Sequence, residues 1–396
     1  MPRKKPTFVS LFSGCGGFDL GFKQAGFKSL GSFDIDPTAV KVHIRNIGAN
    51  CFVTDLQKAS LTTKQLGRPD VVISGSPCQG FSNLGKRNQS DVRNRLLSRG
   101  AEIAVGLQPE VVVLENVMGV LSPGLRAHFD RAISILEGEG YQTTVHKIKC
   151  SDYGVPQIRK RVLVVASLNP AICNLEIVSK AELALEGRLE GVSACSNHEP
   201  VSLKKGTKPF RIAKRIAQHQ KLCNVRGGDR AVPTWEIPEV FGPTTNEERA
   251  VLIAMRRLRR QVRLRPNGDA DPLTITTIKK ECGEMAGKII KGLAVKGFVR
   301  QIGRRYDLAH TFNGKYRRLS KGHPSPAVDT RFGTPGYFLH PEEHRGFSVR
   351  EAARIQGFPD NFIFEGPLSA QYRLVGNAVP PPVAKALAMA IKRTGL

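Results

Sequence analysis

Short apolar runs alternate with longer amphipathic stretches over roughly the first 170 residues of the chain. The runs are rich in β-branched and aromatic residues, which predicts strands, and the stretches between them have helical spacing. We therefore expect an α/β fold over residues 1–169, with a doubly wound, mostly parallel, Rossmann-like sheet. The runs that predict the strands are TFVSLFSG, KSLGSFDID, VVISGSP, EVVVLENV and RVLVVAS.

The alternation stops after Asn169-Pro170, and a polar, basic stretch with irregular glycines and prolines continues to about residue 325. Regular patterning then returns in residues 326–396. We expect residues 170–325 to be a smaller target-recognition domain inserted into the first domain, and residues 326–396 to return to that first domain. The last helix has an apolar stripe that we expect to pack there, formed by Val383, Leu387, Ala390 and Ile391.

A winged helix is predicted within the insertion, over about residues 246–310. NEERAVLIAMRRLRR (246–260) has one apolar helical face, with Asn246 as a candidate cap. LTITTIKKEC and AGKIIKGLAVKGF predict two more helices, and KGFVRQIGRRYDLA predicts a hairpin around Gly303-Arg304. Winged helices commonly place one helix in the DNA major groove. The same elements also occur in domains whose only role is packing.

Basic charge is concentrated in this part of the chain. The formal net charge is +26, and residues 249–318 contain 18 Lys and Arg against 5 Asp and Glu. Clustered basic charge of this size indicates a nucleic-acid partner, here double-stranded DNA, although a solvated basic face is the alternative. The candidate DNA contacts in the insertion are Arg256, Arg257, Lys279, Lys280, Lys288, Arg304 and Arg305.

The eight cysteines are scattered and include no Cys-x-x-Cys pair, so we expect reduced thiols and no metal site. We find no continuous apolar signal segment and no stretch of about 20 apolar residues that would span a membrane. These observations predict a cytoplasmic protein without a membrane partner.

The segment LFSGCGGFDLGF (11–22) follows a predicted strand and opens a helix, so its glycines allow a ligand to approach the backbone. Gly14 and Gly16 fit a dinucleotide fingerprint, but Asp19 stands where its third glycine belongs. A nicotinamide enzyme is therefore disfavoured. Asp34 ends the next strand, where a carboxylate holds the ribose of an adenosine-containing ligand.

Cys78 follows Pro77 in a loop after the strand VVIS, and a thiol there is presented at the ligand edge of the sheet. A lone cysteine is usually an inert apolar residue. Here Glu115, Arg159 and Arg161 are expected at the same edge, which gives the thiol an acid and two guanidiniums as neighbours. Each of these charged residues, taken alone, could instead be a solvated residue at a strand end or in a turn, with no role in a site.

A series of motifs in order resembles the DNA (cytosine-5)-methyltransferases, of the bacterial restriction-modification type. The motifs are FSGCGGF, FDID, TDL, GSPCQGFS, ENV, QIRKR, REAARIQGFPDNF and GNAVPPPVA, and they cover about residues 7–168 and 340–391. The resemblance implies S-adenosyl-L-methionine as cofactor. The residues that it assigns to the cofactor are Phe12, Ser13, Gly14, Cys15, Gly16, Gly17, Phe18, Asp34, Ile35, Asp55, Leu56, Pro77, Leu96, Asn377 and Ala378.

The resemblance also implies a mechanism. Cys78 attacks carbon 6 of a cytosine flipped from the duplex, and Glu115 hydrogen-bonds or protonates ring nitrogen 3. Arg161 orients Glu115 or the base, and Arg159 contacts the cytosine or its backbone. Gln79 and Ser82 belong to the catalytic loop that closes over the DNA.

Two alternatives remain beside site-specific DNA methylation. A tRNA methyltransferase of the same family would share the chemistry, and a non-catalytic DNA-binding protein would share only the charge. The resemblance to restriction-modification enzymes suggests a cognate endonuclease as a partner, and we expect a monomer that associates with the bacterial nucleoid through DNA.

Overall fold

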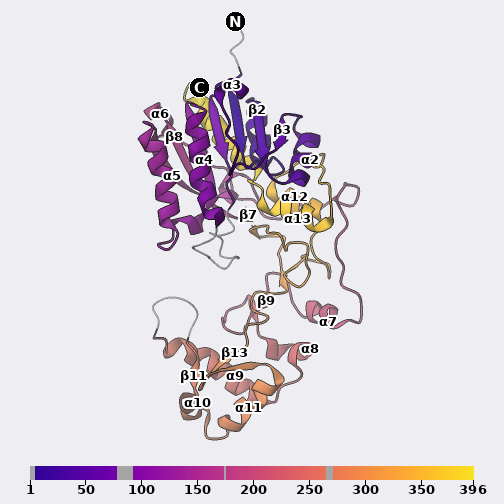
Figure 1. The fold of residues 1–396 in the computed structure, drawn as a ribbon. Helices are drawn as coiled ribbons and strands as arrows, with labels where there is room; N and C mark the ends of the chain where they lie inside the picture. Colours follow the sequence, from indigo (N-terminus) through magenta and orange to yellow (C-terminus); the bar gives the residue numbers. More distant parts are fainter. Residues whose placement is uncertain (1–4, 78–91, 174, 265–270) are drawn as a thin grey trace. The chain divides into compact units, whose positions relative to one another are not determined.

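The computed structural model of the protein describes residues 5–77, 92–173, 175–264 and 271–396. These residues form two compact units (Figure 1). Unit 1 contains Met1–Glu199, Lys321–Thr330 and Ser348–Leu396, and unit 2 contains Pro200–Ser320 and Arg331–Phe347. Each unit has its own hydrophobic core, and each is described by itself.

Unit 1 is built on a seven-stranded sheet with the order β3-β2-β1-β4-β5-β8-β6. All neighbouring pairs are parallel except those of β8, which runs antiparallel between β5 and β6. The sheet is thus the mostly parallel α/β sheet that was predicted. Its strands are β1 (Thr7–Leu11), β2 (Lys28–Asp34), β3 (Cys51–Val53), β4 (Val71–Ser74), β5 (Val111–Val117), β6 (Gln142–Lys149) and β8 (Lys160–Ser167).

The sequence analysis missed β3 and β6, the two edge strands. β3 has only three residues, two of them exposed, and β6 is mostly polar because one side of it faces no neighbouring strand. Neither strand carries the continuous apolar run that a strand buried on both faces requires.

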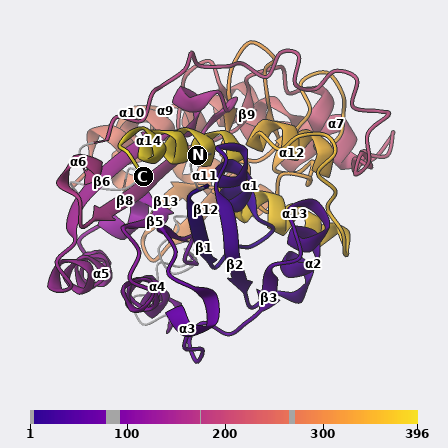
Figure 2. The ribbon, with the colours of Figure 1, turned by 90° about the horizontal axis from the view of Figure 1, so that it is seen from above.

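Alternate residues of each central strand enter opposite cores, as the pleat requires. On β5, Val111 and Val113 pack with one set of helices, whereas Val112 and Leu114 pack with another. Figure 2 shows the sheet covered on both faces. The helices of unit 1 are α1 (Gly17–Gln24), α2 (Pro37–Asn46), α3 (Thr63–Leu66), α4 (Leu96–Gly106), α5 (Arg126–Gly138), α6 (Pro170–Cys173), α12 (Val349–Gln356), α13 (Leu368–Asn377) and α14 (Pro381–Arg393), and a short pair joins β7 (Gln157–Ile158) to β15 (Ser325–Pro326).

The C-terminal helix α14 packs against α1, and its predicted apolar stripe is buried in the core of unit 1 (Figure 2). The two helices approach closely at Gly21, where an added Cβ would lie 2.4 Å from the Cβ of Ala384. The stretch Leu368–Arg393 has the length and composition of a membrane span, but 72% of its apolar window is buried inside the protein. Its apolar residues therefore serve the core.

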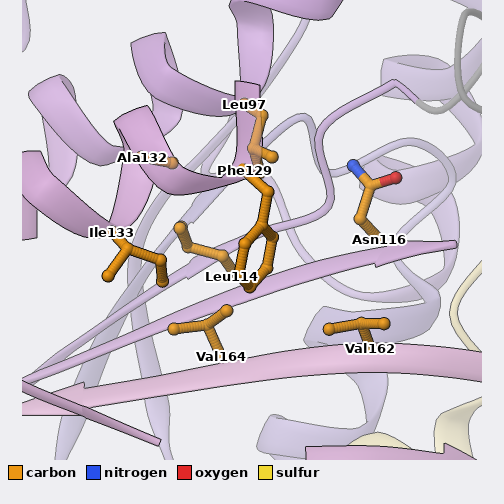
Figure 3. A pocket seen from close by; sticks show the side chains of 8 residues that line it. All are labelled: Leu97, Leu114, Asn116, Phe129, Ala132, Ile133, Val162 and Val164. Atoms are coloured by element: carbon orange, nitrogen blue, oxygen red, sulfur yellow. The ribbon is translucent and has the colours of Figure 1, made fainter. Parts of the chain in front are cut away.

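On the other face of the sheet, helices α4 and α5 cover β5 and β8 (Figure 3). The Phe129 ring from α5 lies over Leu114 of β5 and leaves a gap of only about 10 Å³, too small for any ligand. This face of the sheet is a packed layer. The residues around the gap are Leu97, Leu114, Asn116, Phe129, Ala132, Ile133, Val162 and Val164.

The boundaries of the two units differ from the predicted ones. Residues 170–199 belong to unit 1, because the segment is tied there by Leu175 in the core and by Asn197, whose amide donates to the carbonyl of Phe364 at 2.9 Å. Residues 331–347 belong to unit 2. The sequence of these segments is polar and irregular, so it contained no pattern that predicted which unit they pack against.

Unit 2 contains a group of three helices and three strands in the chain order α9, β11, α10, α11, β12, β13. Helix α9 is capped by Thr245, whose hydroxyl accepts from the backbone N–H of Glu248, so the cap is one residue before the predicted Asn246. The bounds in this unit are α7 (Lys208–Lys214), β9 (Lys221–Leu222), β10 (Ala231–Val232), α8 (Pro238–Phe241), α9 (Asn246–Gln261), β11 (Leu273–Thr274), α10 (Ile275–Cys282), α11 (Ala286–Lys296), β12 (Val299–Ile302), β13 (Arg305–Leu308), β14 (Arg317–Arg318) and β16 (Phe338–Leu339).

A buried polar cluster joins four elements of unit 1 at Asp19. One carboxylate oxygen accepts from Ser10 of β1 at 2.8 Å, and the other accepts from Ser32 of β2 at 2.6 Å. The second oxygen also lies 3.0 Å from Nε2 of His43 on α2. Burial favours the neutral imidazole, but the Asp19 carboxylate outweighs burial and raises the pKa of His43 to about 10. His43 is therefore protonated at neutral pH.

This ion pair predicts a pH-dependent stability. Because the pKa of His43 is near 6.5 when unfolded and about 10 when folded, its contribution is complete below pH 6.5 and is lost as pH rises toward 10. We expect the free energy of unfolding to fall by about 1 kcal/mol per pH unit between pH 7 and pH 9, measured by urea denaturation.

The variant Asp19→Asn should be less stable at pH 7 and should show a much flatter profile between pH 7 and pH 9. A matched change at a histidine of α5, His128→Gln, should leave the slope as in the unmodified protein. An unchanged slope in Asp19→Asn would contradict the assignment.

Candidate active site

A cavity of about 250 Å³ opens at the carboxyl ends of β1, β2, β4 and β5 in unit 1. Ligands bind at this edge in doubly wound sheets, because loops and helix N-termini converge there. Its wall brings together the loop after β1, the end of β2, the start of the loop after β4, Glu115 of β5 and the segment after α13. Ten of the residues assigned to a cofactor thus share one cavity with Glu115, Arg159 and Arg161, which were assigned to catalysis.

The conformation of the glycine-rich loop after β1 is fixed by a carboxylate. Asp34 at the end of β2 accepts from the backbone N–H of Gly14 at 2.8 Å through one oxygen and from that of Asp36 at 2.9 Å through the other. Gly14 has φ of +55°, a conformation that residues with a Cβ seldom adopt. Burial raises the pKa of Asp34 above its usual value, although the two N–H donors oppose this. The carboxylate lies in the cavity wall with Ile35, whose side chain is exposed.

Glu115 and Arg161 form an ion pair in the cavity wall, with Nε of Arg161 2.7 Å from a carboxylate oxygen of Glu115. Both side chains are largely buried, at 10% and 13% exposed. The register of the strands produces the pair. Glu115 lies opposite Leu163, and Arg161 is two residues from Leu163 on the same face of β8.

The strand β5 also fixes the start of the loop that carries the candidate nucleophile. The amide of Asn116 donates to the hydroxyl of Ser76 at 3.2 Å, and Asn116 Oδ1 accepts from the N–H of Val117 at 2.8 Å. Pro77 lies in the cavity wall. Cys78, Gln79 and Ser82 lie outside the described residues, so their roles stay predictions.

Two of the described cysteines in unit 1, Cys15 and Cys150, are poor nucleophiles. Burial raises the pKa of Cys15 to about 12 and that of Cys150 to about 11. Cys15 lies in the cavity wall, but its thiol is directed at the backbone, with its sulfur 3.6 Å from the carbonyl oxygen of Leu374. A thiol is inert at neutral pH unless its pKa is lowered, so neither residue competes with Cys78 as the reactive cysteine.

Arg159 also lines the cavity, and its guanidinium is held by backbone carbonyls. Its guanidinium is 3% exposed, and it donates to the carbonyls of Val328, Gly376 and Ala378 at 3.0, 3.1 and 3.2 Å. Three carbonyls on two chain segments thus occupy its terminal nitrogens. Arg159 thus holds the wall around Ala378 in place, and its contact with the cytosine or its backbone stays a prediction.

The cavity wall contains ten of the fifteen residues predicted to hold the cofactor. Gly16, Gly17, Asp55, Leu56 and Leu96 lie outside it. Leu56 is a core residue, and Gly17 packs against the chain near Val379, where a Cβ would lie 2.3 Å from a carbonyl oxygen. The predicted residues that do line the cavity are Phe12, Ser13, Gly14, Cys15, Phe18, Asp34, Ile35, Pro77, Asn377 and Ala378.

Sequence analysis missed Arg373, which lines the cavity and pairs with Asp36 through Nη1 at 2.6 Å. Its only sequence signal was the spacing of one helical turn before Asn377. The docking of α13 beside the end of β2 decides that this turn faces the cavity.

The predicted DNA-contacting residues of unit 2 divide into two groups. Arg257 pairs with Glu281, Lys279 pairs with Glu284 at 2.7 Å, and Arg256 stacks over Trp235 at 5.6 Å. Lys280, Lys288, Arg304 and Arg305 are exposed, and Arg305 donates to a backbone carbonyl of Pro272. The second group has the more available positive charge.

Comparisons with known proteins show which family the chain resembles. The chain is similar to the type II methyltransferase M.HgiCII of Herpetosiphon aurantiacus, with 30% identity over 98% of this chain and 97% of the relative. It is 28% identical to the type II methyltransferase M.DdeI of Desulfomicrobium norvegicum, over 96% of this chain and 87% of the relative. Among solved structures, the methyltransferase EhMeth of Entamoeba histolytica shares the fold, with 15% identity, a TM-score of 0.55 and 99% coverage of both chains.

These likenesses give no support to a nicotinamide enzyme or to a protein that only binds DNA. The sequence model of the C-5 cytosine-specific DNA methylases matches residues 6–393, which is nearly the whole chain. The protein therefore belongs to the C-5 cytosine-specific DNA methylase family and is a DNA (cytosine-5)-methyltransferase.

Proposed function

We propose that the protein transfers a methyl group from S-adenosyl-L-methionine to carbon 5 of a flipped cytosine in duplex DNA, through a covalent adduct with Cys78. The observation that supports this most is the shared cavity. It joins the Gly14–Asp34 cradle to the Glu115–Arg161 pair and to Pro77, the residue before Cys78. A group-transfer enzyme needs donor and acceptor sites in contact, and one cavity with both sets of residues provides them.

The residues of the cradle suit an adenosine-containing cofactor with a cationic sulfur. The Asp34 carboxylate offers acceptor positions for ribose hydroxyls, while Phe12, Phe18 and Ile35 supply apolar surface for a base. The loop after β1 does not have the third glycine of a pyrophosphate-binding fingerprint, which fits a nucleoside without a diphosphate. When bound, the cofactor supplies an electrophilic methyl group.

The protein residues prepare the cytosine for that methyl group. Carbon 5 of cytosine is a weak nucleophile until a group adds to carbon 6, and Cys78 thiolate forms this bond. Glu115 contacts ring nitrogen 3 and stabilises the charge that develops in the ring. After transfer, a base removes the proton from carbon 5, and the bond from Cys78 to carbon 6 breaks to release the thiolate and the product.

Arg161 acts through Glu115 as a positioning residue. Its guanidinium forms an ion pair with the Glu115 carboxyl from the adjacent strand, and this contact would fix the direction in which the carboxyl faces the base. Arg159 keeps the opposite wall in place through its carbonyl contacts, and this support is the role that its geometry favours.

DNA binding is proposed to involve the catalytic loop and unit 2. The +26 charge suits a polyanion, and Gln79 and Ser82 would contact the DNA around the flipped base. We infer a monomer in the bacterial cytoplasm, with a restriction endonuclease of the same site as a cognate partner. The names of the curated relatives as type II methyltransferases support that inference.

The role of Cys78 predicts that Cys78→Ser lowers methyl transfer by about 10³-fold or more while the protein still binds DNA and S-adenosylhomocysteine. The measurement is transfer of a labelled methyl group to plasmid DNA, beside DNA binding and calorimetry with S-adenosylhomocysteine. Cys195→Ser, a change at a cysteine outside the cavity wall, should behave as the unmodified enzyme.

Duplex DNA with 5-fluorocytosine at the target should trap the enzyme. The last step removes a proton from carbon 5, and a fluorine at that carbon cannot be removed in the same way. Mass spectrometry should place the adduct on Cys78. An adduct on another cysteine, or undiminished transfer by Cys78→Ser, would disprove the mechanism.

The Glu115–Arg161 pair predicts a selective loss of kcat. Glu115→Gln should lower kcat by about 10²–10³-fold, because the developing charge on the ring loses its partner, with little change in KM for the cofactor. Arg161→Ala should lower kcat in the same way, and Arg161→Lys should restore part of it, since a lysine keeps the positive charge beside Glu115.

Lys160→Ala, a change at the exposed neighbour of Arg161, is the matched control and should retain full activity. If Arg161→Ala raises only the KM for the cofactor, or if the lysine variant is no better than the alanine variant, Arg161 does not position Glu115.

The cofactor cradle predicts that Asp34→Ala weakens S-adenosylhomocysteine binding by about 10–100-fold, because a buried carboxylate that accepts charged or polar donors contributes about 1.5–3 kcal/mol. Isothermal titration calorimetry measures this directly. Asp130→Ala, at an exposed carboxylate on α5, should bind as the unmodified protein. Equal affinity in Asp34→Ala would remove Asp34 from the cofactor site.

A further inference from the structure

Helices α9, α10 and α11 and strands β11, β12 and β13 of unit 2 form one small subdomain, which we call the α9–β13 subdomain. Its three strands pair antiparallel in the order β11-β13-β12. The three helices share one core with the sheet, which includes Leu252, Ile278, Ile290 and Leu308. This order of elements around one core, a helix, a strand, two helices and a hairpin, is typical of a winged helix. In a winged helix the last of the three helices is the one that enters the DNA groove.

A buried charge cluster fixes the hairpin of this subdomain to its first helix. Asp307 of β13 is 2% exposed and pairs with Arg259 of α9, which is 1% exposed, and with Arg300 of β12 at 2.8 Å. A fully buried ion pair holds one geometry, because removing either partner leaves an uncompensated charge. The hairpin around Gly303-Arg304 is therefore held in place relative to the helices.

Helix α11 has two distinct faces. Ala286, Ile290 and Leu293 are buried in the subdomain core. The opposite face is solvent-exposed and, at spacings of three and four residues, presents Met285, Lys288, Gly292 and Val295. Two of these residues are exposed apolar side chains, Met285 at 64% and Val295 at 90%, and an added Cβ at Gly292 would meet no atom within 4 Å.

The charge around this face is positive. Lys288 and Lys291 of α11 are exposed, and neither forms an ion pair within 4 Å with an acid among the residues that the structure describes. Lys280 of α10 and Arg304 at the hairpin are exposed too. The nearby acids already have basic partners, since Glu281 of α10 pairs with Arg257, and Glu284, between α10 and α11, pairs with Lys279.

Two exposed apolar side chains within a basic helix face are unusual for a surface whose only role is to keep the protein soluble. Side chains that read DNA need both features, lysines for the phosphates and small apolar groups for the 5-methyl of thymine. Met285 and Val295 are ten residues apart, which is about 15 Å along a helix. That length covers about four base pairs at 3.4 Å per pair.

We propose that α11 lies in the major groove of the target DNA and that Met285 and Val295 select thymines by contact with their 5-methyl groups, with Lys288 on the backbone. The occupant of this face is duplex DNA because the basic side chains surround the apolar pair. Gly292 leaves the middle of the face free for close approach to a base edge. The inference rests on the proposed function and specifies which residues choose the sequence.

The test uses the full-length enzyme on duplexes that carry its own methylation site, identified by bisulfite sequencing of DNA from expressing cells. Each thymine of the site is replaced in turn by deoxyuridine, which removes only the 5-methyl group. For the unmodified enzyme we expect kcat/KM to fall about four-fold at two positions roughly four base pairs apart, the effect of exposing one methyl group.

The variants assign these two positions. Val295→Ser should abolish the penalty at one position and Met285→Ser the penalty at the other, while the remaining position keeps its penalty in each variant. Lys288→Ala should weaken binding to all duplexes alike and reduce the salt dependence by about one unit of slope. Ile253→Ser, at an exposed aliphatic residue of α9, is the matched control and should leave both penalties unchanged.

Three results would overturn the proposal. They are a methylation site without thymine, deoxyuridine penalties that neither serine variant alters, and a change in the oligomeric state of Val295→Ser that identifies the face as a protein contact. In all three the unmodified enzyme still methylates DNA. Failure of the proposed function is separate, because the unmodified enzyme would then transfer no methyl group to any duplex.

Discussion

The antiparallel pairing of β8 with β5 is the constraint on which the active site depends. In a fully parallel sheet, the start of β8 would lie at the edge opposite the carboxyl ends of β1, β2 and β4. Because β8 runs the other way, its first residues lie at that ligand edge, and the register sets Arg161 beside Glu115. One reversed strand thus brings Arg161 to Glu115, the carboxyl that we propose faces the base.

Buried polar groups in unit 1 hold the walls of the cavity, and they do so through specific partners. Asp19 connects β1, α1, β2 and α2 beneath the glycine-rich loop, and Arg159 connects the segments at Val328 and Ala378. A buried polar group without a partner costs free energy, so each such network favours a single arrangement of the segments it joins. Asp19 therefore stabilises the elements that flank the glycine-rich loop, and Arg159 stabilises the segment after α13.

Some of the basic side chains of unit 2 pair with acids of the same unit, and others are exposed to solvent. Arg259 and Arg300 serve the buried Asp307, and Arg257 and Lys279 are balanced by glutamates. The net basic charge seen in the sequence is therefore larger than the charge available to a ligand. Exposed basic side chains remain on α10, α11 and the hairpin, and others lie elsewhere in unit 2, among them Lys204, Lys205 and Arg260.

The sequence by itself determined the α/β class, most central strands, the last helix and the identity of the main chemical groups, because local apolar patterns and short motifs carry that information. It also predicted α9, α10, α11 and the β12–β13 hairpin. The edge strands, the boundary at residue 199, the burial of Arg159 and the place of Arg373 at the cavity depended on contacts between distant segments. Only the tertiary structure decided those features, because the side-chain type sets what a residue can bind, whereas packing sets which partners it meets.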